Sequence, residues 1–453
     1  MNKSSLLIVI ALAATVIGVV VGAPDAAIAS LVTGLSGGAA LLVFWHFSDD
    51  KQVITKVFLA ALAVRIVFGF IVHSFDLREF FGGDANTYDN LGNRLMEIWS
   101  GRAGMDDYLS RRALATTGPG WGMTYFVGAL YLLIGRNILA AQSLCGVIGA
   151  ATAPMVYLCA QKVFHNVRVA KFSALSIALF PSFIIWSSQL LKDGLIIFLL
   201  VLAMTMVLQL QEKFNYAAVI VLVLSLFGIM SLRFYIFYMV MAAVVGSFLI
   251  GTATTLPSVA RRSIVLVIMG LGLTYFGVVR TASVDLDRYG SLEEVQRSRG
   301  DLARSAKSGF GAELDVSTAD GAITALPVGF TYLMLAPFPW QMSSVRQAIP
   351  LPEVLLWWAL IPVMISGLIY AFKNKLRKAA PILIFSIMLT LSYSIFQGNV
   401  GTAYRQRTQI QVFLFMFIAV GWVLYKEKRE NKQLVRKRKR EMFDAPLKGR
   451  MTS

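Results

Sequence analysis

The sequence predicts an all-α polytopic membrane protein with about 12 transmembrane helices and two further interfacial or re-entrant helices. Of its 453 residues, 57% are hydrophobic and only 15% are charged, and a water-soluble domain of this length would carry more charge on its surface. Apolar runs of about 18 or more residues recur along nearly the whole chain, each long enough to cross a bilayer core of roughly 30 Å. A β-barrel would instead show short segments of alternating hydrophobicity.

The predicted spans are separated by short polar loops. They lie near 5–22, 27–47, 54–74, 138–161, 169–190, 194–211, 216–232, 234–251, 263–280, 354–372, 380–397 and 409–425. The first is interpreted as a retained span rather than a signal peptide, because its apolar run is longer than such peptides require. Two pieces, 121–136 and 324–340, are apolar but are short or broken by proline, so we expect them to lie in the interface or to re-enter.

Loop charges predict which side each loop faces. With 12 spans and both termini cytoplasmic, nearly all the inner loops are short and basic, whereas the two long exterior loops are acidic. Loop 75–120 has seven acids against five bases, and loop 281–323 has eight against five. This is the distribution that the positive-inside rule requires. We therefore expect a multi-pass protein of the inner (plasma) membrane, with exterior segments at 75–137 and 281–353.

The net charge of +17 is concentrated in the C-terminal tail. Residues 426–453 carry eleven Lys/Arg against four acids, including the run Arg436–Arg440. A basic run beside a last span typically fixes topology and contacts anionic lipid, so membrane lipids rather than nucleic acid are the expected partner. The predicted organisation is a single transmembrane catalytic module over 1–425, followed by a basic cytoplasmic tail over 426–453.

Ionisable side chains gather at the exterior ends of the predicted spans, where such residues are costly and tend to be functional. The stretch Phe80–Gly101 reads as a polar amphipathic helix after a hydrophobic span. Arg346 lies on the same predicted side. The candidate site residues are Asp84, Tyr88, Asp89, Lys192, Asp193, Arg233, Arg405 and Arg407.

Several motifs resemble the GT-C membrane glycosyltransferases, especially the group of protein O-mannosyltransferases and lipid A aminoarabinose transferases. They are GGDANTY, GPGWGMTYFVGALYLLIGRN and LFPSFIIWSSQLLKDGLIIFLL, with weaker similarity at APFPW and AYRQRTQ. The resemblance covers roughly Phe80–Leu200. It implies sugar transfer from a polyprenyl-phosphate donor to a glycan, lipid or protein acceptor on the exterior face, with Asp84 and Asp193 as catalytic residues. Ala85 stands where many relatives have Glu, which leaves a divalent cation as an open question and no other cofactor implied.

The residue types fit this chemistry independently of the resemblance. Glycosyl transfer needs a base near the acceptor hydroxyl and cations for the departing phosphate. Asp84 is the expected base, and Lys192, Arg233, Arg405 and Arg407 are the expected phosphate ligands. Each residue also has a structural alternative. Asp84 could cap the helix that follows it, Tyr88 could be an interfacial anchor, and Asp89 could be a solvated surface acid.

Two other functions compete with this interpretation. A polysaccharide polymerase or ligase would use a polyprenyl-diphosphate glycan and depend on exterior arginines rather than on Asp84. A transporter of lipid-linked sugars would place polar groups near mid-membrane, usually within repeated halves, whereas the candidate polar groups here gather at one rim and the sequence shows no clear halves.

Overall fold

The structure is a computed structural model that describes residues 24–448, apart from 119, 251–255, 276, 306–307 and 343–344. Within that range the side chains of 249–250, 256–262, 305, 345–346 and 437–448 are not described. The predicted span 5–22 therefore lies outside the described residues, as does the side chain of Arg346.

The described chain is helical almost throughout and contains no strand; an isolated bridge joins Gly309 and Asn399. The all-α class is thereby confirmed. The helices are α2 (Pro24–Phe47), α3 (Lys51–Ser74), α4 (Arg78–Phe81), α5 (Asp84–Trp99), α6 (Tyr108–Leu114), α7 (Trp121–Ile134), α8 (Ile138–Phe164), α9 (Val167–Leu179), α10 (Pro181–Ser187), α11 (Lys192–Glu212), α12 (Tyr216–Leu232), α13 (Phe234–Ile250), α14 (Leu256–Tyr275), α15 (Val278–Tyr289), α16 (Leu292–Ser305), α17 (Ala319–Leu335), the 3-10 turn η1 (Pro339–Gln341), α18 (Val345–Ala348), α19 (Leu351–Asn374), α20 (Leu376–Phe396) and α21 (Val400–Lys448).

Seven of the described helices are long and apolar enough to cross a membrane. They are α2, α3, α8, α11, α19, α20 and the first part of α21. The number rises to nine if two bent pairs, α9 with α10 and α14 with α15, each count as one span. The chain is thus a multi-pass membrane protein, and the figure of 12 spans stays a prediction. Among the shorter apolar helices, α7 has 14 residues, about 21 Å of helix, which is too short to cross a bilayer core.

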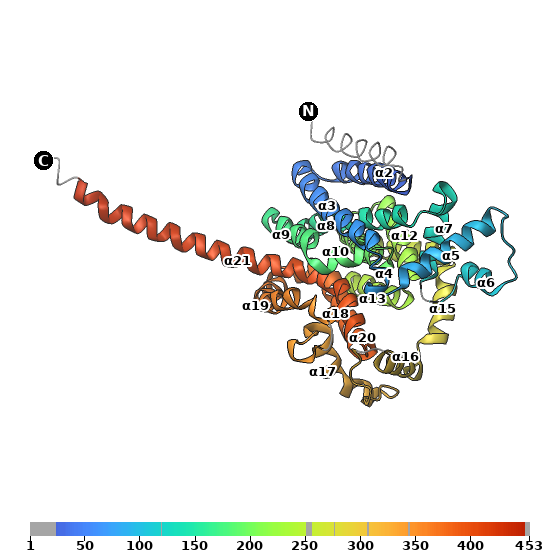
Figure 1. Ribbon diagram of the computed structural model, residues 1–453. Coiled ribbons are helices and arrows are strands. Elements are labelled where there is room, and N and C mark those ends of the chain that lie inside the picture. Colours follow the sequence, from blue (N-terminus) through green and yellow to red (C-terminus); the bar gives the residue numbers. More distant parts are fainter. Residues whose placement is uncertain are drawn as a thin grey trace.

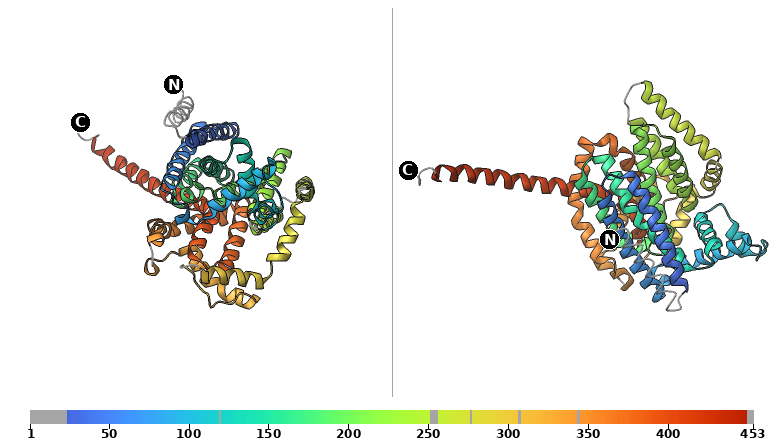
Figure 2. Two further views of the ribbon diagram at one scale, coloured as in Figure 1. Left: turned by 45° about the vertical axis from the view of Figure 1, so that its right-hand side comes forward. Right: turned by 90° about the horizontal axis from the view of Figure 1, so that it is seen from above.

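The helices pack around α8, which contacts α2, α3, α9 and α11. Of the α8 window that could span a membrane, 78% is buried inside the protein, against 28% for α2, so α8 is central and α2 peripheral. Figures 1 and 2 show α21 projecting from one end of the body, while α5 and α6 lie at the other. The basic tail, predicted to be a separate segment, continues α21 as one helix.

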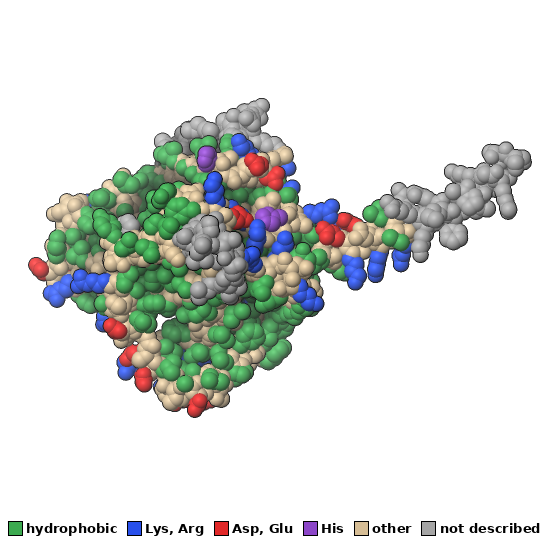
Figure 3. Space-filling view, turned by 180° about the vertical axis from the view of Figure 1, so that it is seen from behind, with side chains coloured by type: hydrophobic (Ala, Val, Ile, Leu, Met, Phe, Trp, Pro, Cys, Tyr) green, Lys and Arg blue, Asp and Glu red, His purple; other side chains and the backbone are tan. Residues whose placement is uncertain are grey.

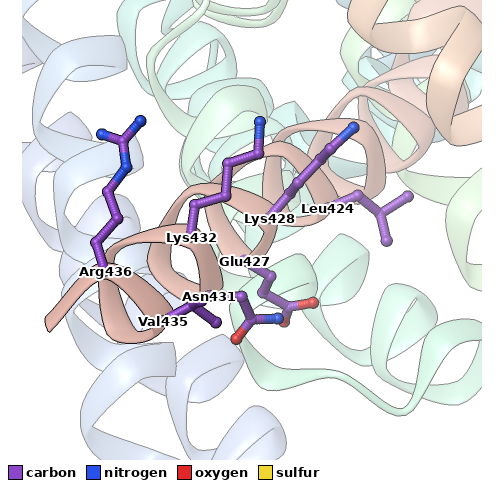
Figure 4. Close-up of a pocket in the computed structure, with 7 residues that line it drawn as sticks. All are labelled: Leu424, Glu427, Lys428, Asn431, Lys432, Val435 and Arg436. Atoms are coloured by element: carbon purple, nitrogen blue, oxygen red, sulfur yellow. The ribbon is translucent and has the colours of Figure 1, made fainter. Parts of the chain in front are cut away.

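Charged side chains cluster around the base of the projecting part of α21 (Figure 3). Lys378 donates to Glu212 over 2.9 Å, and Arg168 donates to Glu430 over 3.1 Å. These residues come from loops that the sequence places in the cytoplasm, and the structure brings them to one end. Further along α21, Lys428, Lys432 and Arg436 point to one side of a shallow hollow (Figure 4), because residues four apart share a helix face.

A break between α9 and α10 shapes the interior. The two helices meet at Pro181 with a bend of 55°, since proline cannot donate the hydrogen bond that would continue a helix. The carbonyls of Ile177 and Ala178, at the end of α9, accept hydrogen bonds from the buried Arg65 guanidinium, which also donates to the Phe183 carbonyl within α10. A cation at membrane depth is therefore paired with helix-end carbonyls, and the bend carries Trp186 toward the site described next.

Candidate functional site

Four charged residues from four separate helices or helix junctions form one ion-pair network. Arg405 on α21 donates from Nη1 to Asp84 Oδ2 over 2.9 Å and from Nε to Asp193 Oδ2 over 2.7 Å. Arg233 donates from Nη2 to the other Asp193 oxygen over 3.3 Å. The network thus joins α5, α11, the α12–α13 junction and α21, which are up to 321 residues apart in sequence.

Asp84 is the exposed end of this network. Its side chain keeps 47% of its surface accessible, whereas that of Asp193 keeps none. The N-cap of α5 is Gly83, and the Asp84 side chain makes no capping hydrogen bond, so the structure does not support the capping alternative. Gly83 has φ +52°, a left-handed conformation that glycine adopts most readily, and this turn directs the first residue of α5 toward Arg405.

Asp193 lies in the first turn of α11, where the helix dipole favours a carboxylate. Both its oxygens are bound by guanidinium groups, and the side chain is fully buried. Arg233 occupies the C-cap of α12, with an extended backbone at φ −155°. The interruption between α12 and α13 therefore turns its guanidinium inward, where Nη1 also donates to the Tyr393 hydroxyl over 3.5 Å. Asp193 fixes the positions of two cations and has no free oxygen for a substrate.

Lys192 lies beside this network without an ion-pair partner among the described residues. A Cβ added to Gly120 would lie 2.8 Å from Lys192 Nζ and 3.2 Å from the Tyr88 hydroxyl, so the ammonium and the hydroxyl border the same turn. Gly120 caps the N-terminus of α7, where the first backbone N–H groups have no partner within the helix. Burial raises the pKa of Tyr88, and the Asp84 carboxylate raises it further, which keeps its hydroxyl proton available for donation.

The charges in this site do not cancel. At their formal charges, Lys192, Arg233 and Arg405 are three cations and Asp84 and Asp193 are two carboxylates, a formal excess of one positive charge. The excess lies at Lys192, beside the Tyr88 hydroxyl and the N-terminus of α7. Such a set of donors binds anions, phosphate among them.

Comparison with known proteins adds no identification. No family model matches the chain, and no curated protein matches it in sequence. The functional interpretation therefore depends on the residues and their geometry.

Two predicted site residues lie away from the network. Asp89 is buried and accepts hydrogen bonds from the Tyr131 hydroxyl over 2.6 Å and from Arg136 Nη2 over 2.5 Å. It therefore joins α5 to α7 and to the turn after α7, and it is not a solvated surface acid. Arg407 is fully buried and donates to the carbonyls of Met334 and Ala336, both over 3.0 Å. It binds the C-terminal end of α17, where a cation is favoured.

Sequence reasoning missed several residues around the site. Trp186 on α10 lies beneath Arg405, with its ring centre 5.5 Å from the guanidinium carbon, a cation–π contact. Asp285 on α15 accepts a hydrogen bond from the Gly118 N–H over 3.2 Å, so the second exterior segment contacts the glycine turn. Asp285 had been counted only as part of the charge of its loop. Within the part of the chain that is described, no group of three or more His, Cys, Asp or Glu side chains could bind a metal ion.

Proposed function

We propose that this chain is an integral membrane glycosyltransferase that moves a sugar from a polyprenyl-phosphate donor to an acceptor on the exterior face. The observation that carries the proposal is the juxtaposition of a half-exposed carboxylate, Asp84, with an unpaired ammonium, Lys192. The first can accept the proton of an acceptor hydroxyl, and the second can bind the phosphate that leaves. The resemblance to GT-C enzymes points to Asp84 and to Asp193, which follows Lys192 in the sequence.

In the proposed step, Asp84 accepts the acceptor's hydroxyl proton while the acceptor oxygen bonds to the anomeric carbon of the sugar. The bond from that carbon to the phosphate oxygen breaks, and its electron pair leaves with polyprenyl phosphate. Lys192 Nζ and the Tyr88 hydroxyl donate to this phosphate, so its developing charge is stabilised where it forms. Asp193 positions Arg405 and Arg233 and takes no proton.

The positions of these groups favour catalysis at a membrane rim. Lys192 and Asp193 begin α11, Arg233 follows α12, and Arg405 lies in the second turn of α21. All are at helix ends, whereas a transport pathway would have its polar groups near the middle of spans. The long basic part of α21 projects from the opposite end of the body (Figure 1). This supports an exterior site and a cytoplasmic tail.

The excess of a single positive charge favours a monophosphate donor over a diphosphate donor. A polymerase or ligase would need additional cations for its diphosphate, yet Arg233 and Arg405 are already paired with Asp193 and Asp84. The polymerase hypothesis therefore remains second.

The purified chain in lipid nanodiscs, supplied with polyprenyl phosphates carrying different radiolabelled sugars, should release polyprenyl phosphate and transfer label. Lys192→Gln should lower kcat/KM about 100-fold, the cost of one donor to a developing anion, whereas Lys192→Arg should retain more activity. Release of label only from polyprenyl-diphosphate glycans would contradict the monophosphate donor. Label that crosses the bilayer with no chemical change would indicate transport.

A matched pair of glycines tests whether the turn before α7 forms the phosphate site. Gly118 and Gly120 have φ +88° and +85°, so alanine at either should cost a similar 1–2 kcal/mol of backbone strain, roughly. Only at Gly120 would the new Cβ meet Lys192; at Gly118 the nearest atom, the Tyr289 hydroxyl, is 3.8 Å away. Gly120→Ala should therefore lower kcat/KM about 100-fold by displacing the ammonium, and Gly118→Ala should not. Equal losses of activity would assign the turn a structural role only.

A further inference from the structure

A second cavity lies on the other side of α21 from the charge network. Its volume is about 230 Å³. It is lined mainly by the segment after α16, by the end of α17 and the segment that follows it, and by Val400 at the start of α21. The segment after α16 is joined to α21 by backbone hydrogen bonds, from Phe310 N to Gly398 O over 2.8 Å and from Val400 N to Ser308 O over 3.0 Å. The cavity is therefore built from the second exterior segment.

The lining combines aromatic faces with uncharged hydrogen-bonding groups. Phe310 and Tyr332 are stacked with ring centres 4.1 Å apart, and Phe338 meets Tyr332 edge to face at 5.4 Å. The side-chain hydrogen-bonding groups of the lining belong to Ser308, Gln341 and Gln347. None of the lining residues that the structure describes is charged.

This composition suits a sugar ring. A saccharide presents C–H faces that pack on aromatic rings and hydroxyls that bond with side-chain amides and hydroxyls. The polar groups lie at the edges of the aromatic rings, since Gln341 Nε2 donates to the Tyr332 hydroxyl over 3.1 Å. The buried Arg299 guanidinium lies behind Phe310, 5.9 Å from the ring centre, and its Nε and Nη2 atoms have no hydrogen-bond partner among the described residues. Its charge disfavours a cationic ligand.

The geometry of α21 gives the separation between the cavity and the charge network. Val400 and Arg405 are five residues apart on α21, about 7.5 Å along the axis and about 140° around it. Val400 and Arg407 are seven apart and share a face, and Arg407 contacts the same end of α17 that lines the cavity. A ligand that occupies both the cavity and the space beside Asp84 must therefore pass around the start of α21, a distance of roughly one helix diameter, 10 Å. One sugar ring is too small for this.

We propose that this cavity is a distal acceptor subsite that binds a neutral or acidic sugar unit of an oligosaccharide chain. The proposal rests on the proposed function, and it selects a glycan among the glycan, lipid and protein acceptors that the sequence leaves open. The acceptor hydroxyl lies at Asp84, and a unit further along the chain lies against Phe310, Tyr332 and Phe338.

The test uses the full chain in nanodiscs, with Tyr332→Phe and Gln341→Ala as variants that remove polar groups and keep the aromatic packing. The acceptors are oligosaccharides of graded length, released by mild acid from the envelope glycans of the host cell. For long acceptors, the half-saturating concentration should rise about tenfold in each variant, the effect of one or two lost hydrogen bonds. For monosaccharides it should not change. Hydrolysis of the lipid-linked donor in the absence of acceptor should also stay at the wild-type rate.

Two results would overturn the subsite. One is equal behaviour of the variants and the wild type with every acceptor length. The other is an equal loss with long and short acceptors. A failure of the proposed function looks different, because the wild type would then release no polyprenyl phosphate from any donor. In that case saturation-transfer NMR with the same oligosaccharides still tests the cavity. If the wild type binds them and Gln341→Ala binds them more weakly, the subsite is supported. If the wild type does not bind them, the subsite is refuted.

Discussion

Replacing Asp84 by asparagine should lower kcat by about 10²–10⁴-fold, the usual contribution of a general base, and should leave the protein folded. Asparagine keeps an oxygen that can accept the hydrogen bond from Arg405 Nη1. The substitution therefore removes the proton acceptor and leaves the positions of the neighbouring side chains nearly unchanged. The side chain is half exposed, and the unfolding temperature should therefore change little. Transfer of label from the lipid-linked donor and thermal unfolding in detergent measure the two effects.

Asp106→Asn is the matched control, because Asp106 is an exposed acid of the same loop and lies outside the network. It should leave both activity and stability unchanged. Full activity of Asp84→Asn would remove the base from the proposed mechanism and would favour the polymerase hypothesis, in which arginines act without this carboxylate. Arg405→Ala separates these hypotheses less well. Arg405 also pairs with the buried Asp193, so its loss would disturb the fold whichever function is correct.

Helix periodicity explains which of the predicted residues come together on α5. Tyr88 is four residues after Asp84, about 40° around the helix, and it lies at the site. Asp89 is five residues after, about 140° around, and it pairs with Arg136 instead. The same rule applies to Arg405 and Arg407, two residues apart and about 200° around. Both arginines were expected to bind phosphate, but because this segment is a helix, only Arg405 lies in the charge network.

The pairing of distant segments could be predicted only in outline. Loop charges place Asp84, Asp193, Arg233 and Arg405 at the same side of the membrane, which is necessary for contact but does not specify it. The actual partners depend on how α5, α11 and α21 pack, and packing of apolar helices leaves little trace in one sequence. Gly120 illustrates the limit. Its position beside Lys192 depends on how α7 packs against α5 and α12, which the motif around it does not specify.

Arg65 is a feature of the sequence that could have predicted a contact between two helices. Arg65 lies within a predicted span of otherwise apolar residues, where an unpaired cation would be costly. The structure supplies its partners from the bend between α9 and α10. A charged residue in a span together with a proline-broken helix elsewhere, at Pro181, predicts that the two meet, since a broken helix exposes carbonyls that need donors. This contact supports the position of Trp186 under Arg405.

Replacing Asp193 by asparagine should lower the stability of the protein as well as its activity, unlike Asp84→Asn, which should lower activity alone. Its carboxylate is fully buried between Arg233 and Arg405, so its removal leaves two guanidinium groups with much of their charge unpaired. Breaking a buried ion pair by removing one partner typically costs about 3–5 kcal/mol. The unfolding temperature should fall markedly, and activity should fall with it because Arg405 is no longer positioned. Thermal unfolding and label transfer, measured on the same preparations, report both.

The double variant Asp193→Asn with Arg233→Gln provides the control, since it removes one of the two uncompensated charges and leaves a neutral amide opposite the asparagine. It should recover part of the lost stability, because a neutral pair of similar volume replaces a buried charge. Activity should stay low, since Arg405 still lacks its anchor. If instead Asp193→Asn kept the wild-type unfolding temperature and abolished transfer, the buried carboxylate would have to be the base, and Asp84 would serve only as a counter-charge to Arg405.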